Sequence, residues 1–267
     1  HYPGPKFGRQ GIRELCGIEK GPILMSALKP LGRSAKDFGE TAYKLALGGC
    51  PLIKDDHSLF NQSYAPFKDR VKACVDSVNN ANTKTGGRSL YIANCTADSM
   101  EFLERAMTAQ ELGAGGIMAA PGLLGLSIIR ELSSAPDFHL PIFLHPCFSG
   151  PLVLSADSGV SPFCYYGQFS RLAGADAAIF TSFGGRFPFT EEVCRKICDG
   201  TETEMGGLRS IFPVPSGGMK WQLFKKMVQV YGPDAIFLVG GALLTESDDL
   251  TANMHFYFEK LNEAVNK

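Results

Sequence analysis

The feature that most constrains the fold of this chain is a regular alternation between short apolar runs and longer amphipathic segments. The alternation occurs eight times along the 267 residues. The runs are too short for stable helices, and they are apolar on successive residues, as in strands of a parallel sheet buried on both faces. We therefore predict strands at residues 23–28, 51–54, 89–94, 116–120, 141–148, 177–181, 211–215 and 236–239.

The segments between these runs carry apolar residues at intervals of three and four, which indicates helices that cover the sheet. The first helix follows Ser34, which can act as its N-cap together with Asp37 three positions later. Its apolar positions are Phe38, Ala42, Leu45 and Ala46. Further helices are predicted at residues 67–81, 99–112, 124–132, 165–172, 191–198, 221–230 and 251–265.

Eight strand-then-helix units match the size and order of an α/β fold of the (β/α)₈ TIM barrel type. No linker rich in Pro, Ser or Gly divides them, so we predict one barrel domain at residues 21–267 after a lead-in segment at residues 1–20. The alternative is an open, doubly wound sheet, which usually places a Gly-rich turn after its first strand. Here that strand is followed by Lys29-Pro30-Leu31-Gly32, which favours the barrel.

Polar and charged residues stand where the predicted strands end, and barrel enzymes build their active sites at these ends. The residues are Lys29, Lys54-Asp55-Asp56-His57, Asn94, His145 and Gly184-Gly185-Arg186. A carboxylate such as Asp56 is a suitable ligand for a hard cation such as Mg²⁺. Taken alone, the cluster at 54–57 also fits a charged strand end with a solvated turn, and a lone histidine such as His145 is usually a core residue.

Pairs of adjacent glycines follow the last two predicted strands, in Ser216-Gly217-Gly218 and Gly240-Gly241. In barrels these positions commonly bind a phosphate group through backbone N–H groups, and glycine lets the backbone approach the anion closely. A tight strand-to-helix turn also favours glycine, so either pair alone is ambiguous. The occurrence of both pairs in the two expected places favours a phosphate site.

Charge and composition narrow the class of partner. The formal net charge is -1 and no run of basic residues occurs, so we expect a small-molecule partner and neither nucleic acid nor a membrane surface. The eight cysteines are scattered singly, and neither a signal sequence nor a membrane span is visible. We expect a cytoplasmic protein, with an organelle left open because the chain begins with His1 and upstream residues are expected.

In this order, the residues resemble the C-terminal domain of the RuBisCO large-chain superfamily, and the resemblance covers nearly the whole chain. It rests on Gly4-Pro5, Gly8, Lys29-Pro30, Ser34-Ala35-Lys36, Gly39, Gly48-Gly49, Lys54-Asp55-Asp56, Asn94, Ser216-Gly217-Gly218 and Gly240-Gly241. The most specific part is Lys54-Asp55-Asp56 with Lys29 one barrel unit earlier.

The resemblance implies a magnesium site and a set of catalytic residues. In the family, the lysine matched by Lys54 is carbamylated by CO₂, and the carbamate binds Mg²⁺ with acidic residues, one of which is matched by Asp56. The lysine matched by Lys29 transfers protons, and the residue matched by Arg186 closes over the substrate. The expected catalytic residues are Lys29, Lys54, Asn94, His145 and Arg186; the expected metal ligands are Lys54, Asp56 and His57; the expected phosphate and substrate contacts are Ser216, Gly217, Gly218, Gly240 and Gly241.

Departures from the family pattern argue against carboxylation. Leu31 stands where a carboxylase has a second lysine, and His57 stands where it has a second acidic ligand. Phe148 replaces an arginine for a second phosphate, and Phe180-Thr181 replaces a histidine, so only one of the two anion sites for a bisphosphate is expected. The chain therefore resembles the RuBisCO-like (type IV) branch. His57 could weaken Mg²⁺ binding, favour a nitrogen-tolerant metal, or act as an acid or base.

This resemblance implies Mg²⁺-dependent enolisation of a sugar or sugar-acid monophosphate. Activities of the branch include isomerisation or enolisation of methylthio-sugar phosphates and decarboxylation or hydrolysis of 3-oxo sugar-acid phosphates, and the sequence does not rank them. The family also implies a homodimer, with an upstream α+β domain, missing from this chain, that completes the partner's site. The alternative is a catalytically inactive homologue with a regulatory or structural role, and carbamylation of Lys54 would separate the two.

Overall fold

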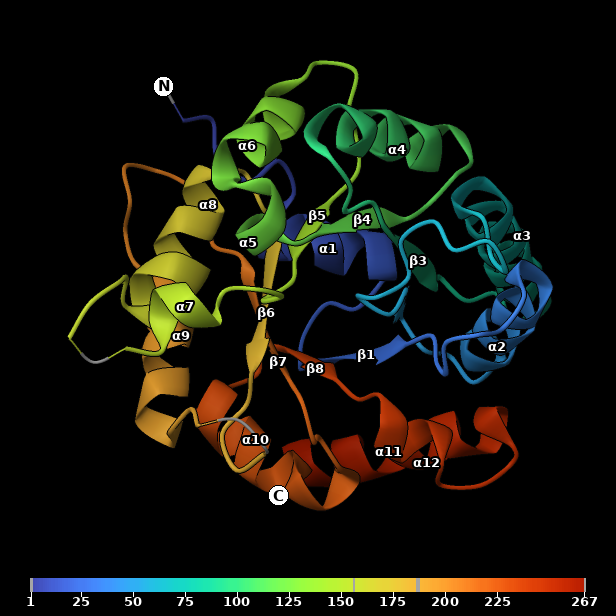
Figure 1. The fold of residues 1–267 in the computed structure, drawn as a ribbon. Coiled ribbons are helices and arrows are strands. Elements are labelled where there is room, and N and C mark those ends of the chain that lie inside the picture. The colour runs from blue at the N-terminus through green and yellow to red at the C-terminus, as the bar shows by residue number, and fades with distance from the viewer. Residues whose placement is uncertain (1, 156, 186–187, 267) are drawn as a thin grey trace.

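The computed structural model describes residues 2–155, 157–185 and 188–266 of the chain. Its centre is an eight-stranded parallel sheet wound into a barrel, with helices around the outside (Figure 1). The strands follow the order β7-β6-β5-β4-β3-β2-β1-β8. Their bounds are β1 Ile23–Ala27, β2 Leu52–Lys54, β3 Leu90–Asn94, β4 Gly116–Ala119, β5 Ile142–Leu144, β6 Ala177–Thr181, β7 Phe212–Ser216 and β8 Ile236–Leu238. The predicted (β/α)₈ barrel is confirmed.

Strands β7 and β8 lie side by side where the barrel closes, but no backbone ladder joins them in the described part of the chain (Figure 1). The sequence of β7 explains this, because it carries Pro213 and Pro215 at alternate positions. The N–H group of Phe212 and the carbonyl group of Ser216 both point to the β6 side. The nitrogens of the two prolines therefore point to β8, and proline has no N–H group to donate.

Helices connect the strands and cover the barrel. Their bounds are α1 Gly8–Cys16, α2 Ala35–Leu47, α3 Phe67–Thr85, α4 Ser99–Glu111, α5 Pro121–Leu124, α6 Leu126–Ser134, α7 Gly150–Val153, α8 Ser170–Leu172, α9 Glu191–Glu202, α10 Phe224–Tyr231, α11 Gly241–Leu244 and α12 Leu250–Val265, with a π-helix η1 at Phe163–Phe169 and a 3₁₀-helix η2 at Trp221–Leu223. The predicted N-cap of α2 is confirmed, since Ser34 and Asp37 form a reciprocal capping box. Across the described ranges, no helix is long and apolar enough to cross a membrane.

Two apolar layers hold the strands, as the unbroken apolar runs predict. On β1, Ile23, Met25 and Ala27 face the interior of the barrel, whereas Leu24 and Leu28 face the helices. The outer layer packs the strands against the surrounding helices, and the inner layer fills the barrel. Because both faces are buried, the strands need no polar alternation.

The helix predicted at 124–132 is divided at Gly125 into the end of α5 and most of α6, and two further elements differ from the sequence-based expectation. The predicted strand at 141–148 is too long, because β5 ends at Leu144. His145 still donates its N–H group to the carbonyl of Ala119, but Pro146 follows and the chain turns out of the sheet. The helix predicted at 165–172 exists, but its first part belongs to the π-helix η1.

Helix α1, within the predicted lead-in segment, closes the N-terminal end of the barrel. Ile12 and Cys16 on one face of this helix pack inside the barrel. Arg13 lies over the ring of Phe212 at 5.1 Å and pairs with Asp234 at 2.6 Å. The segment before the first strand is therefore part of the core.

A buried carboxylate ties the start of α1 to the sheet. Asp176 accepts the N–H groups of Phe7 and Gly8 at 2.8 Å and that of Ile142 at 2.9 Å. The first N–H groups of a helix have no partner within it, so a carboxylate is favourable there. Burial raises the pKa of Asp176 to about 6, although the three donors oppose this rise.

The closure by α1 can be tested with two substitutions on the same helix. Ile12 is fully buried and Leu15 is 37% exposed. We expect Ile12→Ala to lower the free energy of unfolding by about 2–5 kcal/mol, because it leaves a cavity inside the barrel. Leu15→Ala should cost much less. Urea denaturation would measure both, and equal losses would show that α1 is not part of the core.

Candidate active site

The C-terminal ends of the strands open into a cavity of about 850 Å³. Most of the residues predicted to form the site line this one cavity. They are Lys29, Lys54, Asp56, His57, His145, Ser216, Gly217, Gly218, Gly240 and Gly241. Asn94 is not among the lining residues, and Arg186 lies outside the described residues. The strand-end prediction therefore brings together residues from five of the eight strands, which are β1, β2, β5, β7 and β8.

Asp56 is the centre of the charged cluster in this cavity. Its carboxylate pairs with Lys29, and its Oδ1 lies 3.4 Å from Nδ1 of His57. The backbone N–H group of Ser58 donates to Oδ1 at 3.0 Å. Burial alone would raise the pKa of Asp56, but the hydrogen bonds from Lys29 and Ser58 and the nearby positive charges lower it. Asp56 is therefore ionised in the ordinary pH range.

Lys54 is buried at the end of β2, where it is 2% exposed. Its Nζ donates to the carbonyl oxygen of Asp55 at 2.8 Å. Burial lowers the pKa of Lys54 to about 8, with Asp56 and Asp55 opposing this effect and Lys29 adding to it. About a tenth of the amine is therefore neutral at pH 7, far more than for an ordinary lysine, and the neutral amine is the form that attacks an electrophile such as CO₂.

His145 presents a fixed hydrogen-bond donor to the cavity. Its Nδ1 accepts the backbone N–H group of Cys147 at 3.1 Å, so a neutral ring carries its proton on Nε2. Burial, followed by the charges of Lys54, His57 and Lys29, lowers the pKa of His145 well below 6.5. The ring also stacks on that of His57, with centroids 4.5 Å apart. His145 is therefore neutral and donates from Nε2.

The glycine pairs after β7 and β8 have the backbone geometry of an anion site. Gly217 and Gly218 have φ angles of 86° and 79°, which side chains rarely adopt. No backbone hydrogen bond to another described residue uses the N–H groups of Gly217, Gly218 or Gly240. Unpaired amides at a cavity need water or a ligand. The hydroxyl of Ser216 is less available to donate to an anion, because it already donates to the carbonyl of Phe180 at 2.9 Å.

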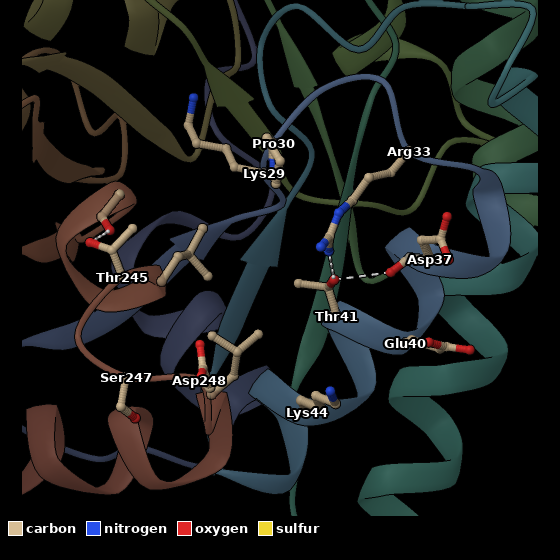
Figure 2. Close-up of a pocket in the computed structure, with 13 residues that line it drawn as sticks. Lys29, Pro30, Arg33, Asp37, Glu40, Thr41, Lys44, Thr245, Ser247 and Asp248 are labelled. Atoms are coloured by element: carbon tan, nitrogen blue, oxygen red, sulfur yellow. Dashed lines mark hydrogen bonds between the residues drawn. The ribbon is translucent and has the colours of Figure 1, made fainter.

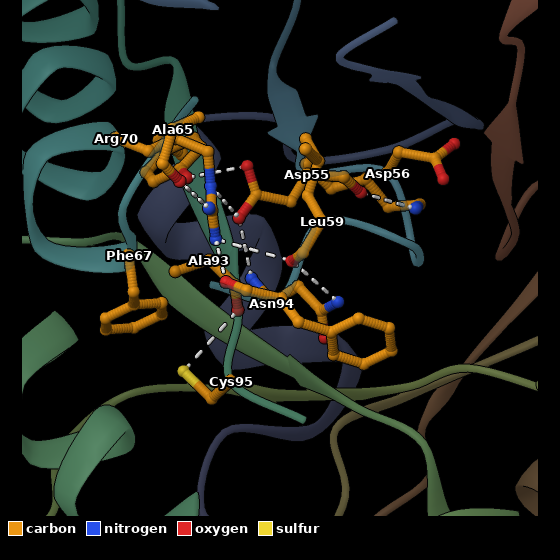
Figure 3. A network of polar contacts seen from close by, with 12 residues as sticks. Asp55, Asp56, Leu59, Ala65, Phe67, Arg70, Ala93, Asn94 and Cys95 are labelled. Atoms are coloured by element: carbon orange, nitrogen blue, oxygen red, sulfur yellow. Dashed lines mark hydrogen bonds and ion pairs between the residues drawn. The ribbon is translucent and has the colours of Figure 1, made fainter. Parts of the chain in front are cut away.

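A fully buried ion pair lies directly behind this cluster (Figure 3). Asp55 accepts from Nε of Arg70 at 3.2 Å, from the hydroxyl of Tyr91 at 2.7 Å and from the N–H group of Asn94 at 3.0 Å. The charge of Asp55 raises the pKa of Arg70 against the opposing effect of burial. The sequence gives one signal of this network, which is a single arginine on the apolar face of the helix that follows β2. Its carboxylate partner is not predictable from that signal.

Asn94 supports the loop after β2 instead of facing the cavity (Figure 3). Its Nδ2 donates to the carbonyls of His57 and Leu59 at 3.0 and 3.1 Å, and its Oδ1 accepts the N–H group of Thr96 at 3.2 Å. Arg70 donates to the carbonyl of Leu59 from the other side, at 3.3 Å. Asn94 thus belongs to the residues that position His57.

A divalent cation fits the cluster only with a further oxygen donor. Among the residues that the structure describes, no group of three His, Cys, Asp or Glu side chains could hold a metal ion. Asp56 brings one carboxylate to the cavity and His57 one imidazole, whereas Mg²⁺ requires about six ligands, mainly oxygen. A carbamate on Lys54 would add oxygens beside Asp56, and water or substrate would complete the shell. The residues present therefore fit a cation in combination with a carbamylated lysine.

A second cavity of about 660 Å³ adjoins the first and shares Lys29, Gly241 and Thr245 with it. Figure 2 shows it between α2 and the segment that joins α11 to α12. Arg33 donates to the hydroxyl of Thr41 there at 3.1 Å. Acidic and basic side chains alternate along its walls, so it offers no site of uniform charge.

The sequence does not predict the apolar wall on the opposite side of the first cavity. This wall consists of Phe148, Val153, Leu154, Tyr166 and Phe189. Only Phe148 has a sequence signal, as the residue that replaces an arginine in the family pattern. The other members come from η1, α7 and the segments after β5 and β6, whose contacts are long-range.

Residues 8–253 match the family described as ribulose bisphosphate carboxylase large chain, catalytic domain. The chain belongs to this family. It is 35% identical over 255 residues to 5-methylthioribulose-1-phosphate isomerase of Rhodospirillum rubrum, and the aligned region covers 94% of this chain and 65% of that protein. It is 36% identical over 244 residues to 2,3-diketo-5-methylthiopentyl-1-phosphate enolase of Geobacillus thermodenitrificans, and the aligned region covers 91% of this chain and 59% of that protein.

Comparison with a solved structure supports the same family membership. The RuBisCO-like protein of Alicyclobacillus acidocaldarius superposes with a TM-score of 0.92 at 31% identity, over 99% of this chain and 67% of that one. The chain is thus a RuBisCO-like protein, as its departures from the carboxylase pattern predict. It spans about 59–67% of the length of these three relatives.

The buried ion pair behind the cluster can be tested by removing one charge. We expect Asp55→Asn to lower the free energy of unfolding by about 3–5 kcal/mol, because Arg70 is left buried without a counter-charge. Asp76→Asn is the matched control, since Asp76 pairs with Lys72 on the exposed face of α3 and should change little. Urea denaturation would measure both, and a small loss for Asp55→Asn would contradict a structural role for the pair.

Proposed function

We propose that this chain catalyses metal-dependent enolisation of a phosphorylated ketone and does not fix CO₂. The observation that carries the proposal is the buried amine of Lys54 beside Asp56 and Lys29, in a cavity that also holds two glycine pairs. Buried charged groups are costly to keep in a core without a use. Enolisation needs a group that removes a proton next to a carbonyl and groups that stabilise the negative oxygen.

A carbamate on Lys54 and the carboxylate of Asp56 would hold the cation, and Mg²⁺ is the cation on which this family generally depends. When bound, the cation supplies Lewis-acid stabilisation of the enolate oxygen. His57 lies beside Asp56, where it either joins the ligands or orients the carboxylate. An imidazole ligand would make the site more tolerant of cations that accept nitrogen.

The remaining side chains have separate tasks in this proposal. Lys29 reaches the cavity beside Asp56 and transfers the proton. His145 donates from Nε2 to the oxygen on which negative charge develops, a role that suits a neutral imidazole. Asn94 keeps the loop of His57 in place. Arg186 is proposed to contact the substrate, as the family resemblance implies.

The proposed substrate carries one phosphate group, bound by the backbone amides of the two glycine pairs. The relatives named above act on methylthio-sugar phosphates, and the apolar wall of the cavity favours that class over sugar-acid phosphates. An isomerase and an enolase of this kind both begin by removing a proton next to a carbonyl. We also propose that the protein is a homodimer, as the family resemblance implies.

Solvent-deuterium exchange tests the proposed chemistry. The protein should incorporate deuterium into 5-methylthioribulose 1-phosphate or 2,3-diketo-5-methylthiopentyl 1-phosphate in the presence of Mg²⁺ and bicarbonate. Exchange should be lost in Lys54→Ala and retained in Lys72→Ala, which changes an exposed lysine. A 3-oxo sugar-acid phosphate tests the other substrate class. If the folded protein exchanges no substrate, the alternative of an inactive regulatory or structural homologue takes precedence.

The pKa of Lys54 leads to a second, independent prediction. Only the neutral amine reacts with CO₂, so carbamate formation in the metal-free protein should increase with pH around a midpoint near 8. A lysine with the ordinary pKa of 10.5 would show this rise at a much higher pH. Nuclear magnetic resonance with isotope-labelled bicarbonate would follow the carbamate signal. Lys54→Arg should abolish the signal, and a signal that survives in this variant would assign it to another amine.

A further inference from the structure

Phe148 combines two properties that a surface aromatic residue rarely has. Its backbone is in the left-handed region, with a φ angle of 63°, and its side chain is 67% exposed although it lines the cavity. Within the described ranges, it is the only residue besides glycines with a positive φ. A bulky residue in this region is strained. Backbone strain at a cavity is an indication of function.

The neighbouring residues hold Phe148 in this conformation. The N–H group and the hydroxyl of Ser149 both donate to the carbonyl of Pro146, at 3.1 and 2.7 Å. The hydroxyl of Tyr166 on η1 lies 2.7 Å from Oγ of Ser149 and therefore donates to it. On the other side α5 packs closely, since a Cβ atom at Gly122 would lie 2.8 Å from the carbonyl carbon of Phe148. The turn is fixed from two sides.

The strand order places Phe148 opposite the charged cluster. In an eight-stranded barrel each strand faces the one four positions away, so β5 faces β1 and β6 faces β2. Lys29 and Asp56 follow β1 and β2, whereas Phe148 and Tyr166 follow β5 and Phe189 follows β6. The glycine pairs after β7 and β8 lie between the two sides. A ligand held by these pairs has the charged cluster on one side and the aromatic wall on the other.

We propose that Phe148 is a specificity-determining residue that packs against the apolar end, methylthio or alkyl, of a monophosphate substrate. This inference rests on the proposed function of the same cavity. An exposed aromatic ring gains from contact with apolar groups and with sulfur. Val153 and Leu154 line the same side of the cavity, and their apolar side chains offer no hydrogen bonds. A second phosphate or a carboxylate placed there would lose its bound water without replacing those hydrogen bonds.

Phe148→Gly separates a role in specificity from a role in stability. If Phe148 stabilised the fold, its loss would lower the midpoint of thermal unfolding, whereas a strained residue kept for specificity predicts a rise. Glycine adopts a positive φ without strain, so the midpoint of thermal unfolding should rise by about 1–3 °C. The kcat/KM ratio between a methylthio-ended ketose monophosphate and its hydroxyl-ended analogue should fall about tenfold. Phe148→Leu keeps an apolar group and should retain most of the preference.

Leu123→Ala is the control for a general effect of exposed apolar surface. Leu123 is 51% exposed on α5 and does not line the cavity, so its substitution should leave the substrate preference unchanged. Light scattering of each variant would report the oligomeric state. If Phe148→Gly slows both substrates equally and changes the oligomeric state, Phe148 serves a subunit interface and the proposal is wrong.

A binding measurement keeps this inference testable apart from catalysis. Calorimetry would compare a methylthio-ended alkyl monophosphate with its hydroxyl-ended analogue, neither of which can enolise. The wild-type protein should bind the methylthio compound more tightly, and Phe148→Gly should remove the difference. This result would support the role of Phe148 even if the protein exchanges no ketone. Equal binding of the two compounds by the wild-type protein would overturn it.

Discussion

The buried carboxylate of Asp55 is the group on which the rest of the site depends. Strand β2 is three residues long, and the alternation at its end turns Lys54 and Asp56 into the cavity and Asp55 outward to the helix layer. A carboxylate buried there needs a cation and hydrogen-bond donors, and Arg70 of α3 and Tyr91 of β3 supply them. An ion pair, in addition to apolar packing, therefore fixes α3 against the sheet.

The same ion pair fixes the loop that carries part of the charged cluster. Arg70 and Asn94 hold this loop through its backbone carbonyls. Held in this way, the loop keeps Asp56 and His57 in place without using the side chains that face the cavity. The lowered pKa of Lys54 has a different cause, because burial dominates it and the carboxylates of Asp56 and Asp55 oppose the effect only in part.

Periodicity predicts the barrel well because every strand is apolar on both faces, and strand ends then identify most of the cavity. The same reasoning extends β5 too far, since Pro146, Cys147 and Phe148 make the segment look apolar beyond His145, whereas the strand ends at Leu144. Position at a strand end also does not say whether an amide such as that of Asn94 faces the cavity or a loop, and here it contacts the loop. The sequence does not predict contacts between residues or elements that are distant in the chain. Examples are the ion pair of Asp55 with Arg70 and the packing of α1 inside the barrel, where the local sequence does not identify both partners.

The residues proposed to remove the proton and those proposed to set specificity follow different strands, whereas His145 shares the end of β5 with the apolar wall. The charged cluster follows β1 and β2, the anion site follows β7 and β8, and the apolar wall follows β5 and β6. Removal of the proton concerns only the carbonyl end of a substrate, so a substitution at Phe148 can change specificity without altering Lys29, Lys54 or Asp56. A strained turn is tolerable there, because the ion pair that supports the cluster lies on the opposite side of the barrel. Strain at Phe148 therefore costs stability without displacing Lys54 or Asp56.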